Sequence, residues 1–325
     1  MRPLWKDVLT AAFMGMILPG ILLNFAVMLL DSQPQTAAAR ETIPQETTPE
    51  TVPLPMRLRK SNGTVEDMDM DSYLVGVVCA EMPASFETEA LKAQSVVART
   101  YAQKAYTTLG KHGDGSVCTR SSCCQAYLSE EDYLAQGGTQ EDLEKIKAAV
   151  AATSGYVLTY GGELIEATYF SCSGGSTEDA AAVWGTDFPY LQAVSSPGEE
   201  SAAHYTDTVT FTPRQFQNAL GVILTGSPKS WFGTTTYTEG GGVATMMIGG
   251  KPYTGTQLRS LLNLRSTAFT VSPSEEAITI TTQGYGHRVG MSQYGADAMA
   301  VTGSSYEEIL SYYYQGTELT QITHP

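Results

Sequence analysis

The chain has 325 residues, 42% hydrophobic and 16% charged, which is the composition of a folded protein with one large or two modest domains. Its 34 acidic and 19 basic residues give a net charge of −15, which argues against nucleic acid as a partner, because phosphate binding needs a concentrated basic surface. The 31 glycines and 18 tyrosines, with few charged residues, are typical of a turn-rich protein that works outside the cytosol. Since there are five cysteines, at least one thiol stays out of any internal disulfide.

A long apolar segment lies close to the N-terminus. Residues 8–30 carry no charge, and a helix of this length reaches roughly 34 Å, enough to cross a hydrocarbon core of about 30 Å. Arg2 and Lys6 precede the segment, so the positive-inside rule places residues 1–7 in the cytoplasm and the bulk of the chain outside. We expect an uncleaved single-pass membrane anchor. The alternative is a signal peptide cleaved near Ala37–Ala39, although signal peptides have a shorter apolar core.

Residues 31–55 are rich in Pro, Thr, Gln and Glu and have almost nothing to bury, so we predict a disordered linker. Residues 56–325 contain no further low-complexity break and no internal repeat. Helical and strand patterns are mixed there without a regular βαβ rhythm. The predicted fold class is therefore α+β, as one extracytoplasmic globular unit of helices and antiparallel strands.

The first predicted elements of this unit are helical. Tyr73–Ala80 is an apolar run that fits either a buried strand or a buried helix. A helix is expected from Ser85, as its N-cap, to about Leu109, and a second one over Glu141–Thr153. The pair Gly161-Gly162 then predicts a hairpin whose strands are Tyr156–Tyr160 and Glu163–Phe170.

The remaining predicted elements are short. Gly240–Gly242 is expected at a hairpin tip, since no glycine-rich phosphate loop is present. We predict a helix opening at Thr212-Pro213, a short helix over Thr256–Leu262, a strand over Ala277–Thr282, and helices near Gln293–Val301 and Tyr306–Tyr314.

Glu81 is the first candidate for chemistry. It follows an apolar run and precedes Met82 and Pro83, so its carboxyl group is expected against apolar neighbours at the end of an element. Desolvation of that kind raises the pKa of a carboxyl group and allows it to act as a general acid near pH 7. The alternative is a helix cap or a salt-bridge partner.

A second candidate is a possible metal site at His112, Cys118 and Cys124, which lie in a polar, glycine-rich loop between two predicted helices. Two thiolates and an imidazole match the preferences of zinc and leave a fourth position for water or another ligand. The alternative is a disulfide between two of Cys118, Cys123 and Cys124, which an extracytoplasmic location permits.

Two further segments are open to more than one interpretation. Cys172, within Ser171-Cys-Ser-Gly-Gly, could be a nucleophile with His287 or His204 as its base, or could belong to a tight turn. The segment Gly284–Gly295 is dense in glycine, with tyrosines on which sugars could stack; alternatively its glycines only satisfy turn geometry.

Several short blocks, in a fixed order from about residue 60 to 318, together resemble the stage II sporulation protein D family, within the larger group that carries the amidase-enhancer domain. The blocks are Glu81-Met-Pro-Ala-Ser-Phe, Glu89-Ala-Leu-Lys-Ala-Gln, Ala98-Arg-Thr-Tyr, Ser171-Cys-Ser-Gly-Gly-Ser-Thr, Trp184-Gly, Asp187-Phe-Pro-Tyr-Leu, Gly284–Gly295 and Tyr312-Tyr-Tyr-Gln-Gly. The single apolar segment and the Pro-rich linker are also similar to the sporulation branch.

The resemblance implies a lytic transglycosylase that acts on peptidoglycan during engulfment of the forespore, with Glu81 as the catalytic acid. Glu81 would protonate the oxygen of the MurNAc–GlcNAc β-1,4 bond and then take the proton of the MurNAc C6 hydroxyl as the 1,6-anhydro ring closes. No water attacks, so the second carboxylate of an ordinary glycosidase is not required. The expected substrate is glycan strands stripped of their stem peptides, and the expected partners are a cell-wall amidase and a polytopic membrane protein.

The resemblance also implies roles for other residues. Arg99 falls in the family's Ala-Arg-Thr-Tyr block and would orient the substrate or Glu81. The resemblance favours a structural Zn²⁺ at His112, Cys118 and Cys124, since some relatives carry a metal at this spacing. Groove positions that would bind substrate are expected at Ser171, Cys172, His287, Gln293 and Tyr294.

Three other functions compete with this hypothesis. The first is a non-catalytic glycan-binding enhancer of the amidase, which needs every motif except an acidic group at Glu81. The second is a muramidase that hydrolyses the bond, and the third is a cysteine hydrolase that depends on Cys172.

Overall fold

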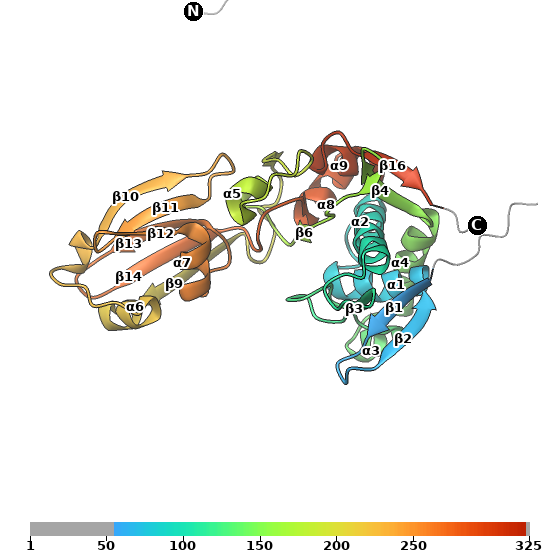
Figure 1. Cartoon of the computed structure of the whole chain (residues 1–325), viewed down its shortest axis with the longest axis horizontal. Helices are drawn as coiled ribbons and strands as arrows, with labels where there is room; N and C mark the ends of the chain where they lie inside the picture. Colours follow the sequence, from blue (N-terminus) through green and yellow to red (C-terminus); the bar gives the residue numbers. More distant parts are fainter. Residues whose placement is uncertain (1–54, 323–325) are drawn as a thin grey trace, which may run out of the picture. The chain divides into compact units, whose positions relative to one another are not determined.

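The computed structural model describes residues 55–322 (Figure 1). The predicted anchor over 8–30 and the predicted linker up to residue 54 lie outside this range. Within the described range, no helix is both long and apolar enough to cross a membrane. The described residues belong to one compact unit with two hydrophobic cores.

The first core is helical and is arranged around one long helix, α2, which packs against the four other main helices (Figure 1). The five helices are α1 (Met70–Glu81), α2 (Thr88–Thr107), α4 (Gln140–Ala152), α8 (Gln293–Val301) and α9 (Tyr306–Tyr313). Small and β-branched side chains of α2, among them Ala93, Val96 and Val97, are fully buried. These small residues let the neighbouring helices approach closely.

Two small sheets flank these helices, and a short helix, α3 (Glu130–Ala135), lies beside α1. In one sheet, β1 pairs antiparallel with β2 and parallel with β3. In the other, β4 lies between β16 and β5. The strands are β1 (Pro55–Arg59), β2 (Val65–Asp69), β3 (Ser116–Cys118), β4 (Tyr156–Tyr160), β5 (Glu163–Leu164) and β16 (Glu318–Gln321).

The second core belongs to residues 206–283, called here the β lobe. Its two antiparallel sheets have the strand orders β13-β14-β9 and β10-β11-β12. The elements are β9 (Thr206–Phe211), α6 (Pro213–Leu220), η1 (Pro228–Ser230), β10 (Phe232–Tyr237), β11 (Val243–Ile248), β12 (Lys251–Thr254), α7 (Gly255–Leu261), β13 (Ala268–Pro273) and β14 (Ile278–Gln283). The segment that enters the lobe and the segment that leaves it lie side by side. They are joined by a hydrogen bond in which the Gly284 N–H donates to the Tyr205 carbonyl at 2.8 Å.

A short connecting region joins the two cores. It contains β6 (Tyr169–Phe170), β7 (Gly175–Ser176), α5 (Ala180–Trp184), β8 (Ser195–Ser196) and β15 (Met291–Ser292). Here β6 pairs in parallel with β15, and β7 pairs antiparallel with β8.

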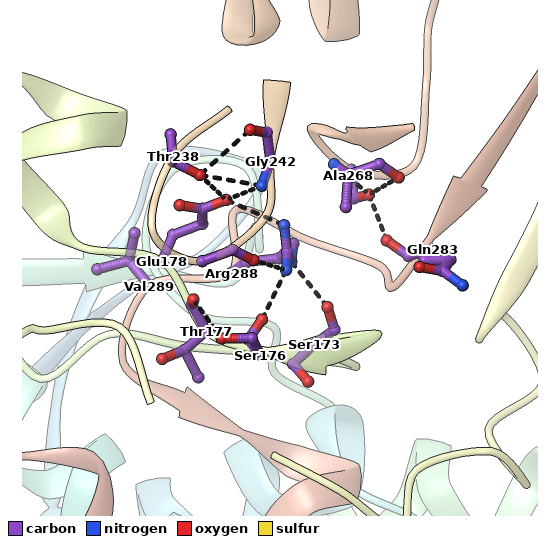
Figure 2. A network of polar contacts seen from close by, with 12 residues as sticks. Ser173, Ser176, Thr177, Glu178, Thr238, Gly242, Ala268, Gln283, Arg288 and Val289 are labelled. Atoms are coloured by element: carbon purple, nitrogen blue, oxygen red, sulfur yellow. Dashed lines mark hydrogen bonds and ion pairs between the residues drawn. The ribbon is translucent and has the colours of Figure 1, made fainter. Parts of the chain in front are cut away.

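A buried ion pair holds the β lobe to this connecting region (Figure 2). Nη1 of Arg288 lies 3.0 Å from Oε1 of Glu178, and the two side chains are 2% and 1% exposed. The same guanidinium donates to the carbonyls of Ser173 and Ser176, both in the connecting region, and to that of Gly240 in the β lobe, each at 2.7 Å.

The carboxylate of this pair also reaches the β lobe (Figure 2). Oε1 of Glu178 accepts the Gly242 N–H and the Thr238 hydroxyl, each at 2.9 Å. A Cβ at Gly242 would lie 2.2 Å from that oxygen, so the approach requires glycine. Arg288 itself has a φ of 66°, a conformation that L-residues rarely adopt.

The predicted α+β class is confirmed, and Tyr73–Ala80 is helical within α1. The N-cap of α2 is Glu87 and not Ser85, because residues 83–86 form a turn in which the Phe86 N–H bonds to the Pro83 carbonyl. The hairpin at Gly161-Gly162 is confirmed for β4 and β5, but Tyr169–Phe170 leaves it to pair with β15.

The later predicted elements are present with shifts of at most one residue at their ends. They are α4, α6, α7, β14, α8 and α9, and Gly240–Gly242 lies in the turn between β10 and β11. The start of α6 is predicted correctly because it has a strong local signal. Thr212 and Gln215 form a capping box there, with Pro213 as the first helical residue.

Candidate active site

A cleft of about 960 Å³ lies where residues of the helical core, the connecting region and the β lobe meet. The helical core contributes Glu81 and Gln293, the connecting region contributes Trp184 and His287, and the β lobe contributes Arg259. Among the described residues that line the cleft, Glu81 is the only one with a carboxyl side chain. The cleft therefore presents a single acidic group.

Glu81 is the last residue of α1, which ends there because Met82 takes up an extended conformation ahead of Pro83. Burial raises the pKa of its carboxyl group above the ordinary value, and hydrogen bonds from the Ala126 backbone, Tyr169 and Gln293 partly oppose that shift. The Ala126 N–H lies 2.7 Å from Oε1. No cation contributes to the shift, so this carboxyl group can keep a proton to higher pH than an ordinary glutamate.

A buried chain of side chains supports Glu81 from behind. The Tyr73 hydroxyl donates to Oε1 of Gln125 at 2.9 Å, and Nε2 of Gln125 donates to the Tyr169 hydroxyl at 3.2 Å. The Tyr169 hydroxyl in turn bonds to the Glu81 carboxyl group. Since Tyr73 and Gln125 are buried, this chain fixes the orientation of the acid before any ligand binds.

Four metal-binding side chains gather beside this network. The donor atoms of His112, Cys118, Cys123 and Cys124 all lie within 4.8 Å of one another. Nε2 of His112 is 3.5 Å from Sγ of Cys124 and 3.9 Å from that of Cys123. Three thiols and one imidazole at these separations are a donor set for a tetrahedral ion such as zinc.

The electrostatics of the cluster favour a thiolate at Cys118, whereas burial and the charge of that thiolate raise the pKa of Cys124 to about 11. Burial raises the pKa of Cys118, but hydrogen bonds from the Arg120 backbone, His112, Cys123 and Cys124 outweigh it and bring that pKa to about 6. All five cysteines are free thiols, so the structure has no disulfide among Cys118, Cys123 and Cys124. The predicted set of His112, Cys118 and Cys124 is extended by Cys123, whose thiol lies where the sequence predicts water or another ligand as the fourth donor.

Of the six residues predicted to bind substrate, three line the cleft and three do not. Ser171, His287 and Gln293 line the cleft. Arg99, Cys172 and Tyr294 are not among its lining residues. Tyr294 instead packs its ring edge against Phe86, with the centroids 4.9 Å apart.

Arg99 stabilises the helical core. Its side chain is 0% exposed, pairs with Asp71 at 2.8 Å and donates to the Thr153 carbonyl at 2.6 Å. These contacts join the start of α1 to the end of α4. Arg99 therefore has no direct contact with the cleft that would support a role in orienting the substrate.

Cys172 is fully buried, and burial together with the nearby Glu199 carboxylate raises the pKa of its thiol to about 12. Glu199 accepts the N–H and hydroxyl of Ser173, so this segment is a turn built on a buried carboxylate. A thiol with this pKa is a poor nucleophile, which argues against the cysteine-hydrolase alternative.

His287 belongs to an aromatic wall of the cleft. Its ring lies 5.4 Å from that of Trp184 and 5.6 Å from that of Phe170, centroid to centroid. Burial and the positive charge of Arg259 lower its pKa to about 4, so the imidazole is neutral at pH 7. Nδ1 accepts the Val289 N–H at 3.1 Å, which orients the ring. His204, the other base considered for Cys172, packs against the ring of Tyr285.

Three important residues were missed by the sequence analysis as site residues: Gln125, Tyr169 and Arg259. Gln125 and Tyr169 have no motif of their own, although Gln125 directly follows Cys124. Arg259 lies in the β lobe, where no sequence motif was recognised. Only the folded arrangement brings these three positions to Glu81 or to the cleft.

The fold and the cleft define an α+β protein with one protonatable carboxyl group beside a thiol–imidazole cluster. The family described as Stage II sporulation protein matches residues 59–160. Stage II sporulation protein D of Bacillus subtilis (strain 168) is 42% identical over 268 residues, which cover 81% of this chain and 78% of the relative. The same protein of Bacillus amyloliquefaciens is 40% identical over 291 residues, covering 88% and 83%. The chain belongs to the stage II sporulation protein D family.

A more distant relative carries a different name. The protein called Amidase enhancer from Bacillus subtilis (strain 168) is 32% identical over 305 residues, which cover 76% of this chain but 40% of the relative. The likeness to the wider amidase-enhancer group, inferred from short blocks, thus extends along most of the chain.

Proposed function

We propose that this protein is a lytic transglycosylase that cleaves the MurNAc–GlcNAc β-1,4 bond of peptidoglycan, with Glu81 as its catalytic acid and base. One observation carries the proposal: among residues 55–322, Glu81 is the single carboxyl group lining the cleft, and burial raises its pKa. A hydrolase of the ordinary kind needs two carboxyl groups, whereas a transglycosylase can work with one.

The proposed reaction has two proton transfers. The protonated Glu81 donates to the glycosidic oxygen, the C1–O bond of MurNAc breaks, and the GlcNAc hydroxyl leaves. The resulting Glu81 carboxylate takes the proton of the MurNAc C6 hydroxyl, whose oxygen bonds to C1 and closes the 1,6-anhydro ring. The Ala126 N–H and the Tyr169 hydroxyl stabilise the carboxylate between the two transfers.

The four-residue cluster would hold a structural zinc ion. His112, Cys118, Cys123 and Cys124 supply four ligands, which is the closed coordination of structural sites rather than the open one of catalytic sites. The ion would fix the loop that carries Gln125 and Ala126, the two residues that support Tyr169 and Glu81.

The sequence supports the remaining parts of the proposal. The apolar segment 8–30 would anchor the enzyme in the cell membrane, with the N-terminus in the cytoplasm and the folded unit outside. The proposed substrate is glycan strands that a partner amidase has stripped of stem peptides. The proposed partners are that amidase and a polytopic membrane protein of the engulfment complex.

The test is an assay of the full chain in detergent on purified glycan strands, with the products read by mass spectrometry. We expect wild-type protein to form 1,6-anhydro-MurNAc ends, which are lighter by one water than hydrolysed ends, and Glu81→Gln to form them about 10²- to 10⁴-fold more slowly. Glu66→Gln, which removes an exposed carboxylate of β2, is the matched control and should leave the product unchanged.

Two results would contradict the proposal. Reducing MurNAc ends would indicate a muramidase. Intact strands, bound equally by wild-type and Glu81→Gln protein, would indicate a non-catalytic enhancer. Circular dichroism of both variants shows whether the folded state is retained.

A further inference from the structure

The side chain of Arg259 stands out in the cleft because no described carboxylate forms an ion pair with it. The guanidinium is half-buried among the cleft residues, and that burial lowers its pKa, opposed by Tyr285 and by no described carboxylate. Such an arrangement is unexpected in a chain with 34 acidic and 19 basic residues. A desolvated cation without a counter-ion costs free energy, which a bound anion would recover.

Neighbouring cations are already engaged. Lys111, which also lines the cleft, donates to the Cys123 carbonyl. Arg265 lies 3.5 Å from Asp207 and stacks over the ring of Tyr285 at 4.7 Å. Of the two cations that line the cleft in the described range, neither has a carboxylate partner, but only Arg259 also lacks a hydrogen bond to another described residue, which leaves its guanidinium available to a ligand.

Arg259 is also held on a rigid element. Helix α7 begins with a capping box between Thr254 and Gln257, and Leu258 anchors it in the core of the β lobe. At Gly255 an added Cβ would lie 1.9 Å from the Val243 carbonyl, so α7 sits directly on β11. A guanidinium on such a base can recognise a carboxylate with defined geometry.

The chemistry of the proposed substrate supplies one anion. Each MurNAc unit carries a lactyl carboxyl group, which is a free carboxylate in a strand without stem peptides and a neutral amide where the peptide is attached. We propose that Arg259 binds the free lactyl carboxylate of a MurNAc unit and so makes the cleft selective for peptide-free strands. This inference rests on the proposed function, and it gives the β lobe the task of recognising the substrate.

The neighbouring side chains fit this assignment. His287 is neutral at pH 7, so it adds no positive charge beside Arg259 at the aromatic wall. Trp184, 41% exposed, offers a flat face on which a sugar ring can stack. The wall thus combines one stacking surface with one cation, which suits an acidic sugar.

The experiment compares three substrates of equal length: peptide-free strands, the same strands with the lactyl carboxyl converted to a methyl amide, and peptide-bearing strands. Affinity is measured first, with Glu81→Gln protein and with Glu81→Gln combined with Arg259→Gln. We expect the second substitution to weaken binding of the carboxylate strands about 10- to 100-fold and that of the methyl-amide strands less than about twofold. Lys251→Gln, which removes an exposed cation of the β lobe, is the matched control and should change neither affinity.

The rate constants form a second, separate readout. In proteins that keep Glu81, Arg259→Gln should raise KM for carboxylate strands with little change in kcat, and Arg259→Lys should restore part of the loss. Equal weakening on carboxylate and methyl-amide strands would overturn the inference. If no strand is cleaved by wild-type protein, the proposed chemistry fails, while the affinity measurements still decide the role of Arg259.

Discussion

The two sides of the cleft are built differently. On the helical side, Glu81 lies at the end of a buried helix and is oriented by a chain of buried side chains through Gln125 and Tyr169. On the other side, the β lobe brings Arg259 on a short helix and is held by the network around Arg288. The proposed catalytic acid and the proposed recognition residue thus belong to separate cores, so substitutions at one should leave the role of the other unchanged.

The largest expected effect is on the reactive side. Glu81→Gln should lower turnover by about 10²- to 10⁴-fold, the usual contribution of a general acid. Because the folded-state pKa of Glu81 is raised, the folded protein binds this proton more tightly, and stability falls as pH rises from the unfolded pKa through the folded one. Glu81→Gln removes that loss and should be more stable than wild type at pH 8 but not at pH 4.

Thermal unfolding of both proteins across pH 4–9 checks this sign. A Glu81→Gln protein that is less stable than wild type at pH 8 would mean that the carboxylate is well solvated when folded. In that case the proposed elevation of its pKa would be wrong.

The next largest effect concerns the joint between the two regions. Arg288→Met leaves Glu178 buried without its counter-ion and should destabilise the protein by about 3–5 kcal/mol. Arg288→Met combined with Glu178→Met removes both charges and should recover much of this loss. Urea unfolding measures both values, and a single variant within about 0.5 kcal/mol of wild type would show that the network contributes little.

Removal of metal should have an effect of intermediate size. Stripping zinc with a chelator at pH 7 should lower the melting temperature by about 5–10 °C and leave the thiols of Cys118, Cys123 and Cys124 open to alkylation. Zinc should reverse both changes, and Cys124→Ser should reproduce the loss. Unchanged alkylation with and without zinc would exclude a metal at these residues, and Cys172 provides a buried internal control.

The smallest effect is expected from the support of the acid. Tyr169→Phe removes one hydrogen bond to Glu81 and should lower kcat by about tenfold, with KM unchanged. Its pH–rate profile should shift to higher pH, because that hydrogen bond lowers the pKa of Glu81. Tyr133→Phe, on the short helix α3, is the control and should leave the profile in place.

The separate elements on both sides of the cleft were largely predictable from sequence, including α6, α7 and β14 of the β lobe, whereas the contacts between them were not. Local signals, such as the cap at Thr212 and the turn at Gly161, depend on neighbours in the chain and were found correctly. The network around Arg288 joins residues more than 100 positions apart through backbone carbonyls, which leave no trace in the sequence. Arg99 lies in a motif that the sequence shows clearly, but its buried contact with the end of α4 cannot be predicted from that motif.

The hydrogen bond between Gly284 and Tyr205 has a consequence for how such a protein can change over time. Because the two ends of residues 206–283 meet, this stretch can be exchanged or deleted with a short bridge and without rerouting the rest of the chain. The match to the family's described region ends at residue 160, before this stretch begins. A lineage could therefore keep Glu81 and its buried support while replacing the part that faces it, and so acquire a new ligand preference at an unchanged acid.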